Sequence, residues 1–122
     1  MGDGRMVKIL IAEDEAFTAM ALVDLLQAEG HTVRDAADGA QAIEILQDFQ
    51  PDIIVTDLMM PHVDGYELIR HVRDQPGPQP GIILITGVPR AKLPGDLSYD
   101  GYMGKPVDHD GLKTLVERLS PA

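Results

Sequence analysis

Short, continuous apolar runs alternate along this chain with amphipathic segments of helical spacing. The runs lie at residues 7–12, 52–57 and 81–86, with a half-buried version at 31–36 and a short one at 99–103. Uninterrupted β-branched runs are typical of strands that are buried on both faces of a sheet. Helices placed between such strands favour parallel pairing through right-handed crossovers. The pattern therefore predicts an α/β fold with a doubly wound, five-stranded parallel sheet.

Four segments carry apolar side chains at helical spacing. They begin near residue 15, at Asp38, at Asp64 and near Asp108, and we expect the first two to end at Gly30 and Pro51. Asp38 and Asp64 each open a stretch that resembles a capping box. The apolar faces predicted in this way are Ala21, Leu22, Leu25 and Leu26; Ala42, Ile43 and Leu46; Leu68, Ile69 and Val72; and Leu112, Leu115, Val116 and Leu119.

The connection between the fourth and fifth strands breaks this alternation. It reads GVPRAKLPGDLSYDG, with Pro89 and Pro94 close together and no apolar helical period. Proline inside a helix removes a hydrogen bond and clashes with the preceding turn. We therefore expect a short or irregular segment of elevated mobility at residues 88–98 in place of a full helix.

Composition limits the class of protein. A chain of 122 residues predicts one domain, here residues 7–120, behind a disordered start at residues 1–6. The formal net charge of −10 argues against direct binding of nucleic acid or of an anionic membrane surface. No apolar run is long enough to cross a membrane, no signal peptide is evident, and cysteine is absent. These features indicate a cytoplasmic protein.

Polar side chains stand where the predicted strands end. Glu13 and Asp14 follow the first strand, Asp57 ends the third, Thr86 ends the fourth and Lys105 follows the fifth. In doubly wound sheets the functional site lies outside the carboxyl ends of the strands, so the fold would gather these groups at one edge. Clustered carboxylates suit Mg²⁺, and an additional aspartate can act as a nucleophile in aspartyl-phosphate chemistry. The set predicts a site for a transient acyl phosphate.

The same residues carry a family resemblance. The Glu13–Asp14 pair, Asp57 followed by MPHVDG, then Thr86, Tyr102 and the Lys105–Pro106 pair, resemble the pattern of response regulator receiver domains from about Val7 to Leu119. The resemblance implies a flavodoxin-like sheet of strand order 2-1-3-4-5. It also implies a two-component phosphorelay, in which a sensor histidine kinase or a histidine phosphotransfer protein donates the phosphoryl group. With no further module after Leu119, we expect a stand-alone receiver without an output domain, acting through protein contact or onward transfer.

The resemblance also implies a role for each site residue. Asp57 resembles the phosphoacceptor. Asp14 and Asp57 would hold Mg²⁺, with Glu13 binding directly or through water and the backbone carbonyl of Met59 as a further ligand. Thr86 and Lys105 would bind the phosphoryl group, Thr86 and Tyr102 would form the switch, and the Lys105–Pro106 peptide would be cis. The Thr86–Gly87 pair is similar to a subgroup in which a mobile loop replaces the fourth helix.

Three alternatives stay open at this point. An interaction-only receiver would bind a partner without phosphorylation, which the intact set of Asp57, Thr86 and Lys105 disfavours. A phosphatase of the haloacid dehalogenase type would want an acid where Met59 stands, and a nucleotide binder would want a glycine-rich turn after the first strand. Met59 and Val88 are apolar neighbours of the expected site and predict slow dephosphorylation. The four histidines, His31, His62, His71 and His109, and the pair Arg70 and Arg73 are interpreted as surface residues.

Overall fold

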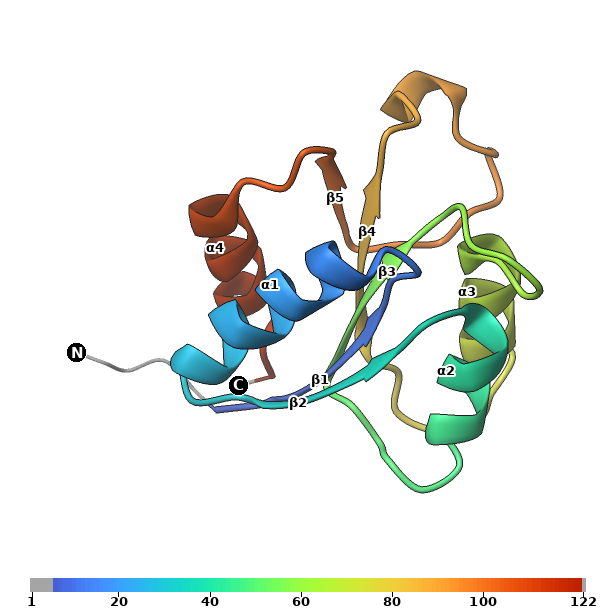
Figure 1. Ribbon diagram of the computed structural model, residues 1–122. Coiled ribbons are helices and arrows are strands. Elements are labelled where there is room, and N and C mark those ends of the chain that lie inside the picture. The colour runs from blue at the N-terminus through green and yellow to red at the C-terminus, as the bar shows by residue number, and fades with distance from the viewer. Residues whose placement is uncertain (1–5, 122) are drawn as a thin grey trace.

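The computed structural model describes residues 6–121 and contains one parallel sheet of five strands (Figure 1). The strand order is β2-β1-β3-β4-β5, which confirms the predicted doubly wound topology. The first five residues of the predicted disordered start lie outside the described part of the chain. The strands are β1 (Lys8–Ala12), β2 (Thr32–Ala36), β3 (Ile53–Asp57), β4 (Gly81–Thr86) and β5 (Gly101–Gly104).

The helices cover both faces of the sheet, α1 and α4 on one side and α2 and α3 on the other (Figure 1). Successive residues of a strand point to opposite faces, so each central strand serves two cores. Leu10 and Ile54 pack toward α2 and α3, whereas Ile9 and Ile53 pack toward α1 and α4. The helices are α1 (Ala16–Ala28), α2 (Gly39–Ile45), α3 (Gly65–Arg73) and α4 (His109–Leu119).

The helices begin where the sequence predicts, but the buried face of α1 and the end of α2 differ from the prediction. The side chains of Asp38 and Asp64 accept hydrogen bonds from the backbone N–H groups of Gln41 and Glu67, as a cap requires. However, α1 buries Ala19 rather than the predicted Ala21, because the face that meets the sheet is centred on Ala19, Leu22 and Leu26.

The second difference is the end of α2, which stops at Ile45 rather than at Pro51. The backbone N–H groups of Gln47 and Asp48 bond to the carbonyl groups three residues earlier. Such bonds tighten the backbone into turns, so the helix closes before proline could stop it.

The segment between β4 and β5 contains a single 3₁₀ turn, η1 (Arg90–Lys92), and no α-helix. This confirms the predicted short or irregular segment, while its mobility stays a prediction. The face that a full helix would cover is filled instead by side chains of the segment itself. Leu97 is buried, and Val88, Leu93 and Tyr99 are half-buried against the core on the α2–α3 side.

Candidate functional site

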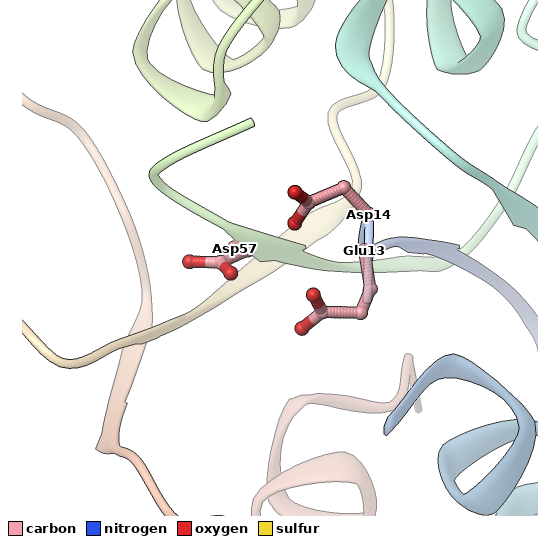
Figure 2. A group of neighbouring side chains, drawn as sticks. All are labelled: Glu13, Asp14 and Asp57. Atoms are coloured by element: carbon pink, nitrogen blue, oxygen red, sulfur yellow. The ribbon is translucent and has the colours of Figure 1, made fainter. Parts of the chain in front are cut away.

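Three carboxylates converge at the carboxyl edge of the sheet (Figure 2). Glu13 and Asp14 follow β1 and Asp57 ends β3, and these strands are neighbours in parallel register. One oxygen from each carboxylate lies within 4.8 Å of the others. Glu13 and Asp57 are only 3% and 6% exposed, whereas Asp14 is exposed. The structure therefore brings together the three acidic residues predicted from the sequence and leaves one side of the cluster open.

Lys105 supplies a cation within this acidic cluster. Its Nζ donates to Oδ2 of Asp57 at 2.6 Å and lies 3.1 Å from Oε1 of Glu13. The Lys105–Pro106 peptide is cis, as the family resemblance implies. Burial would lower the pKa of this ammonium, but its hydrogen bonds to Asp57 and Glu13 outweigh burial and raise the pKa. Lys105 is therefore held in its charged form beside both carboxylates.

Burial has the opposite effect on Glu13. It disfavours the carboxylate and raises the pKa of Glu13, although hydrogen bonds from the Glu15 backbone N–H and from Lys105 act against it. A second cation near the three acids would stabilise their ionised forms further. Carboxylate oxygens are the ligands that Mg²⁺ prefers, and the open side at Asp14 leaves room for retained water. The residues present therefore fit a magnesium ion.

Close packing of α3 against the end of β3 sets the position of Asp57. A Cβ at Gly65 would lie 2.1 Å from the Asp57 carbonyl oxygen, so glycine is required at this helix start. The Gly65 N–H donates to the Leu58 carbonyl oxygen at 2.9 Å, which closes the turn between strand and helix. Within that turn, the Met59 N–H donates to Oδ1 of Asp57 at 3.3 Å. The Met59 side chain is 65% exposed beside the acceptor.

Thr86 and Tyr102 contact the loop that follows β4. The Thr86 hydroxyl is buried and accepts a hydrogen bond from the Val88 N–H at 3.1 Å. The Tyr102 hydroxyl donates to the Val88 carbonyl oxygen at 2.7 Å, and this ring is half-buried. The guanidinium of Arg90 lies 5.7 Å from the centre of the Tyr102 ring, within range of a cation–π interaction. Both predicted switch residues thus bind the same backbone residue.

Two of the histidines differ in how well they match the sequence prediction of surface residues. His62 is exposed, as predicted, and its Nδ1 lies 3.0 Å from Oδ2 of Asp38. His31 is half-buried rather than on the surface, since its Nδ1 accepts a hydrogen bond from the Val7 N–H at 3.1 Å. Burial lowers the pKa of His31, against the raising effect of two nearby glutamates.

Arg73 was also predicted to be a surface residue, and this prediction is wrong. The side chain is half-buried and bonds to other parts of the chain. Its guanidinium donates to Oδ2 of Asp100 at 3.0 Å and to the backbone carbonyl groups of Pro80 and Ser98, both at 3.3 Å. Tyr66, which the sequence did not single out, donates to Oδ2 of Asp96 at 2.5 Å. No spacing rule connects Arg73 and Tyr66 with Asp96, Ser98 and Asp100, since these pairs form only where the β4–β5 segment lies against α3.

Between residues 6 and 121, no helix combines the length and apolar character needed to cross a membrane. The site itself is an acidic cluster with one lysine, and it lies at the carboxyl edge of a doubly wound sheet.

The fold and the site together define the class as a doubly wound α/β domain with an acidic cluster at the carboxyl edge of its sheet, and the comparison with protein families narrows this class. The chain belongs to the response regulator receiver domain family, whose model matches residues 9–117. The chain is therefore similar to the receiver domains of two-component response regulators, a family of signalling modules, rather than to the phosphatases or nucleotide binders considered above.

Individual relatives agree. The chain is 34% identical over 117 residues to the sensor kinase CckA of Brucella abortus, a match that covers 91% of this chain and 12% of that protein. It is 34% identical over 116 residues to the transcriptional regulatory protein TcrA of Mycobacterium tuberculosis, covering 93% of this chain and 46% of the relative. The crystal structure of a response regulator signal receiver domain from Bermanella marisrubri matches with a TM-score of 0.82 and 32% identity, covering 92% and 96% of the two chains. The chain thus spans about half or less of the curated relatives named here.

Proposed function

We propose that this chain is a phosphoaspartate receiver that takes a phosphoryl group onto Asp57 in a Mg²⁺-dependent reaction, within a domain spanning residues 7–120. The observation that carries the proposal is the Lys105 ammonium, which lies 2.6 Å from Oδ2 of Asp57 and next to the second buried carboxylate, Glu13. A buried carboxylate is stabilised by a cation whatever its role. At Asp57 the same cation can also balance the negative charge that a phosphoryl group would add, which supports the role of Asp57 as an acceptor.

The transfer would proceed by in-line attack. A carboxylate oxygen of Asp57 forms a bond to phosphorus while the bond to the donor's imidazole nitrogen breaks, and that nitrogen leaves with the electron pair. Lys105 would move its hydrogen bond from the carboxylate to a phosphoryl oxygen. Bound at Asp14, Asp57, the Met59 carbonyl and Glu13, directly or through water, Mg²⁺ would neutralise charge on the phosphoryl oxygens.

Thr86 would complete the phosphoryl site. Its hydroxyl now accepts from the Val88 N–H, and it would turn to donate to a phosphoryl oxygen. Tyr102 would respond, because it binds the other polar group of Val88. Thr86 and Tyr102 would therefore connect phosphorylation to the loop that follows β4.

The donor would be a sensor histidine kinase or a histidine phosphotransfer protein in the cytoplasm. A phosphohistidine can present its phosphorus at the open side of the cluster, where Asp14 is exposed. Family membership and the match to a sensor kinase support this class of donor. A direct nucleic-acid partner is disfavoured by the net charge of −10.

Incubation with acetyl phosphate tests the proposal. We expect the intact mass to show one phosphoryl group on the wild type in Mg²⁺, little without Mg²⁺, and none on Asp57→Asn. Asp52→Asn is the matched control, since Asp52 lies at the opposite end of β3. A wild-type protein that stays unmodified in Mg²⁺, with folding verified, would instead support the interaction-only receiver.

A further inference from the structure

The loop between β3 and α3, residues 58–64, is held from two sides. At its α3 end, the Gly65 N–H donates to the Leu58 carbonyl oxygen at 2.9 Å. On its other side lies the start of α2, where the Gly39 N–H donates to the Val63 carbonyl oxygen at 2.8 Å. A Cβ at Gly39 would lie 2.3 Å from that oxygen, so α2 begins in direct contact with the loop. The course of the loop therefore depends on α2 as well as on α3.

His62, within this loop, has an unusual backbone conformation. Its φ is 65°, and among residues 6–121 it is the one residue other than glycine with a positive φ. The left-handed region costs free energy for a residue with a Cβ, and it persists where surrounding contacts hold it. The contact here is made by the His62 ring, whose Nδ1 lies 3.0 Å from Oδ2 of Asp38. A strained backbone and a specific side-chain contact thus occur at one residue.

Asp38 joins this loop to the first turn of α2. Its Oδ1 accepts from the Gln41 N–H at 2.8 Å and caps the helix, while its Oδ2 faces His62. Hydrogen bonds from the Gln41 N–H and from His62 lower the pKa of Asp38. Asp38 is therefore a carboxylate, which can only accept, so Nδ1 of His62 is the donor of the pair. One carboxylate thus holds both the helix start and residue 62.

A short path leads from His62 to the metal site. Met59 lies three residues before His62, and its N–H donates to Oδ1 of Asp57 at 3.3 Å. Its carbonyl oxygen is the backbone ligand proposed for Mg²⁺. Between the two residues, Met60 is buried in the core on the α2–α3 side and Pro61 has a fixed φ. With Met60 anchored, the contact at His62 restrains the remaining rotation of this backbone, and with it the direction of the Met59 carbonyl.

We propose that His62 is a positioning residue, which acts through Asp38 to hold the Met59 carbonyl in place and thereby raises the affinity of the acidic cluster for Mg²⁺. The inference rests on the proposed function for the ligand role of Met59. Within residues 6–121, His62 makes no bond to the three acids of the cluster, and its partner is Asp38. Its part is to reduce the freedom of the loop before the ion arrives, so that binding has less to order.

Three substitutions separate this role from a general loss of structure in the loop. His62→Gly keeps access to the left-handed backbone and removes the ring. His62→Asn also accepts that backbone, and its amide can donate to Asp38. Asp38→Ser keeps a cap for α2 but removes the carboxylate that faces His62. His71→Gln, in the last turn of α3, is the matched control.

Mg²⁺ is titrated into each protein, and binding is followed through the backbone amide resonances. We expect His62→Gly and Asp38→Ser each to weaken the affinity about fivefold, the factor that one net hydrogen bond is worth. The double variant should bind no more weakly than either single variant, because both remove the same contact. His62→Asn should recover part of the loss, and His71→Gln should bind as the wild type does. Urea denaturation of the metal-free proteins verifies that each variant is folded.

Unchanged affinity in His62→Gly, or additive losses in the double variant, overturns the proposal. If Asp38→Ser does not fold, His62→Gly and His62→Asn decide it, since equal losses in these two exclude a role for the donor. A wild type that binds no Mg²⁺ removes the proposed metal site and this inference together. A wild type that binds Mg²⁺ but takes no phosphoryl group from acetyl phosphate ends only the acceptor role of Asp57, and the titrations still decide the role of His62.

Discussion

The hydroxyl groups of Thr86 and Tyr102 bind the two polar backbone groups of a single residue, Val88. Thr86 accepts from its N–H at 3.1 Å and Tyr102 donates to its carbonyl oxygen at 2.7 Å. A movement of either side chain therefore breaks a bond to the same peptide segment. This shared residue couples the end of β4 to β5 without a helix between them.

Removing the Tyr102 hydroxyl tests the strength of this coupling. A net hydrogen bond is worth about 1 kcal/mol, so Tyr102→Phe should speed amide exchange at Lys92 and Leu93 about fivefold. Hydrogen-exchange mass spectrometry on peptides of the β4–β5 segment measures this change. Tyr99→Phe is the matched control, because among residues 6–121 the Tyr99 hydroxyl takes part only in the long contact from Arg90 at 3.4 Å. Equal exchange in the two variants would contradict the coupling.

Removal of carboxylates should weaken Mg²⁺ binding. We expect Asp14→Ala and Asp57→Asn each to lower the affinity about tenfold or more, since each removes a charged oxygen ligand. Isothermal titration calorimetry measures the affinity, and Asp24→Asn, on the exposed side of α1, serves as the control. Unchanged affinity in both Asp14→Ala and Asp57→Asn would remove the metal site.

Met59 should prolong the life of the phosphorylated state. Its exposed side chain stands next to the acceptor and cannot orient a water for attack on phosphorus. We expect Met59→Asn to speed the decay of phosphorylated protein about tenfold, which corresponds to about 1.4 kcal/mol of barrier. The decay is followed in Mg²⁺ after the donor is removed, with the exposed Met20→Asn as control.

Val88, the second apolar neighbour expected from the sequence, is a poorer test of the same idea. It is half-buried against the core on the α2–α3 side, so Val88→Glu would bring a carboxylate into an apolar contact. If Met59→Asn decays no faster than the wild type, residue 59 does not set the lifetime.

His31 should make stability depend on pH. Its pKa is lowered from 6.5, so the folded state binds the proton less tightly than the unfolded state does. The stability that neutral His31 contributes is therefore complete above pH 6.5 and is lost as the pH falls through the folded pKa. His31→Asn keeps an acceptor for the Val7 N–H without titrating.

We expect urea unfolding to show a smaller loss of stability for His31→Asn than for the wild type between about pH 7.5 and about pH 5.5. The exposed His109→Asn is the control and should follow the wild type. Parallel pH dependence of wild type and His31→Asn would exclude this role for the histidine.

Arg73 should stabilise the fold through its planar group. Arg73→Lys retains the charge but cannot serve Ser98, Pro80 and Asp100 at once, so we expect a loss of about 1–2 kcal/mol in the free energy of unfolding. Urea denaturation measures the loss. Arg70→Lys, on the exposed side of the same helix, should change little, and equal effects of the two substitutions would show that the contacts of Arg73 contribute nothing special.

The sequence alone determined the sheet and the place of the site. Uninterrupted apolar runs can be satisfied only by strands covered on both faces, and the chain leaves each strand where polar residues begin. Parallel pairing then brings Glu13, Asp57 and the residues after β4 and β5 to one edge. Pro89 and Pro94 likewise predicted the missing helix, because proline acts locally on the backbone.

Only the tertiary structure decided which partners the remaining polar residues meet. Arg73 and His31 looked like surface residues, yet Arg73 binds the β4–β5 segment and His31 binds the start of β1. Such contacts join residues 24 to 27 positions apart in the sequence. The Arg73 contact depends on where the irregular β4–β5 segment lies against α3, and the His31 contact depends on the pairing of β1 with β2. No local spacing encodes either arrangement. The choice of Ala19 over Ala21 on α1 has the same origin, since the helix turns to suit the sheet beneath it.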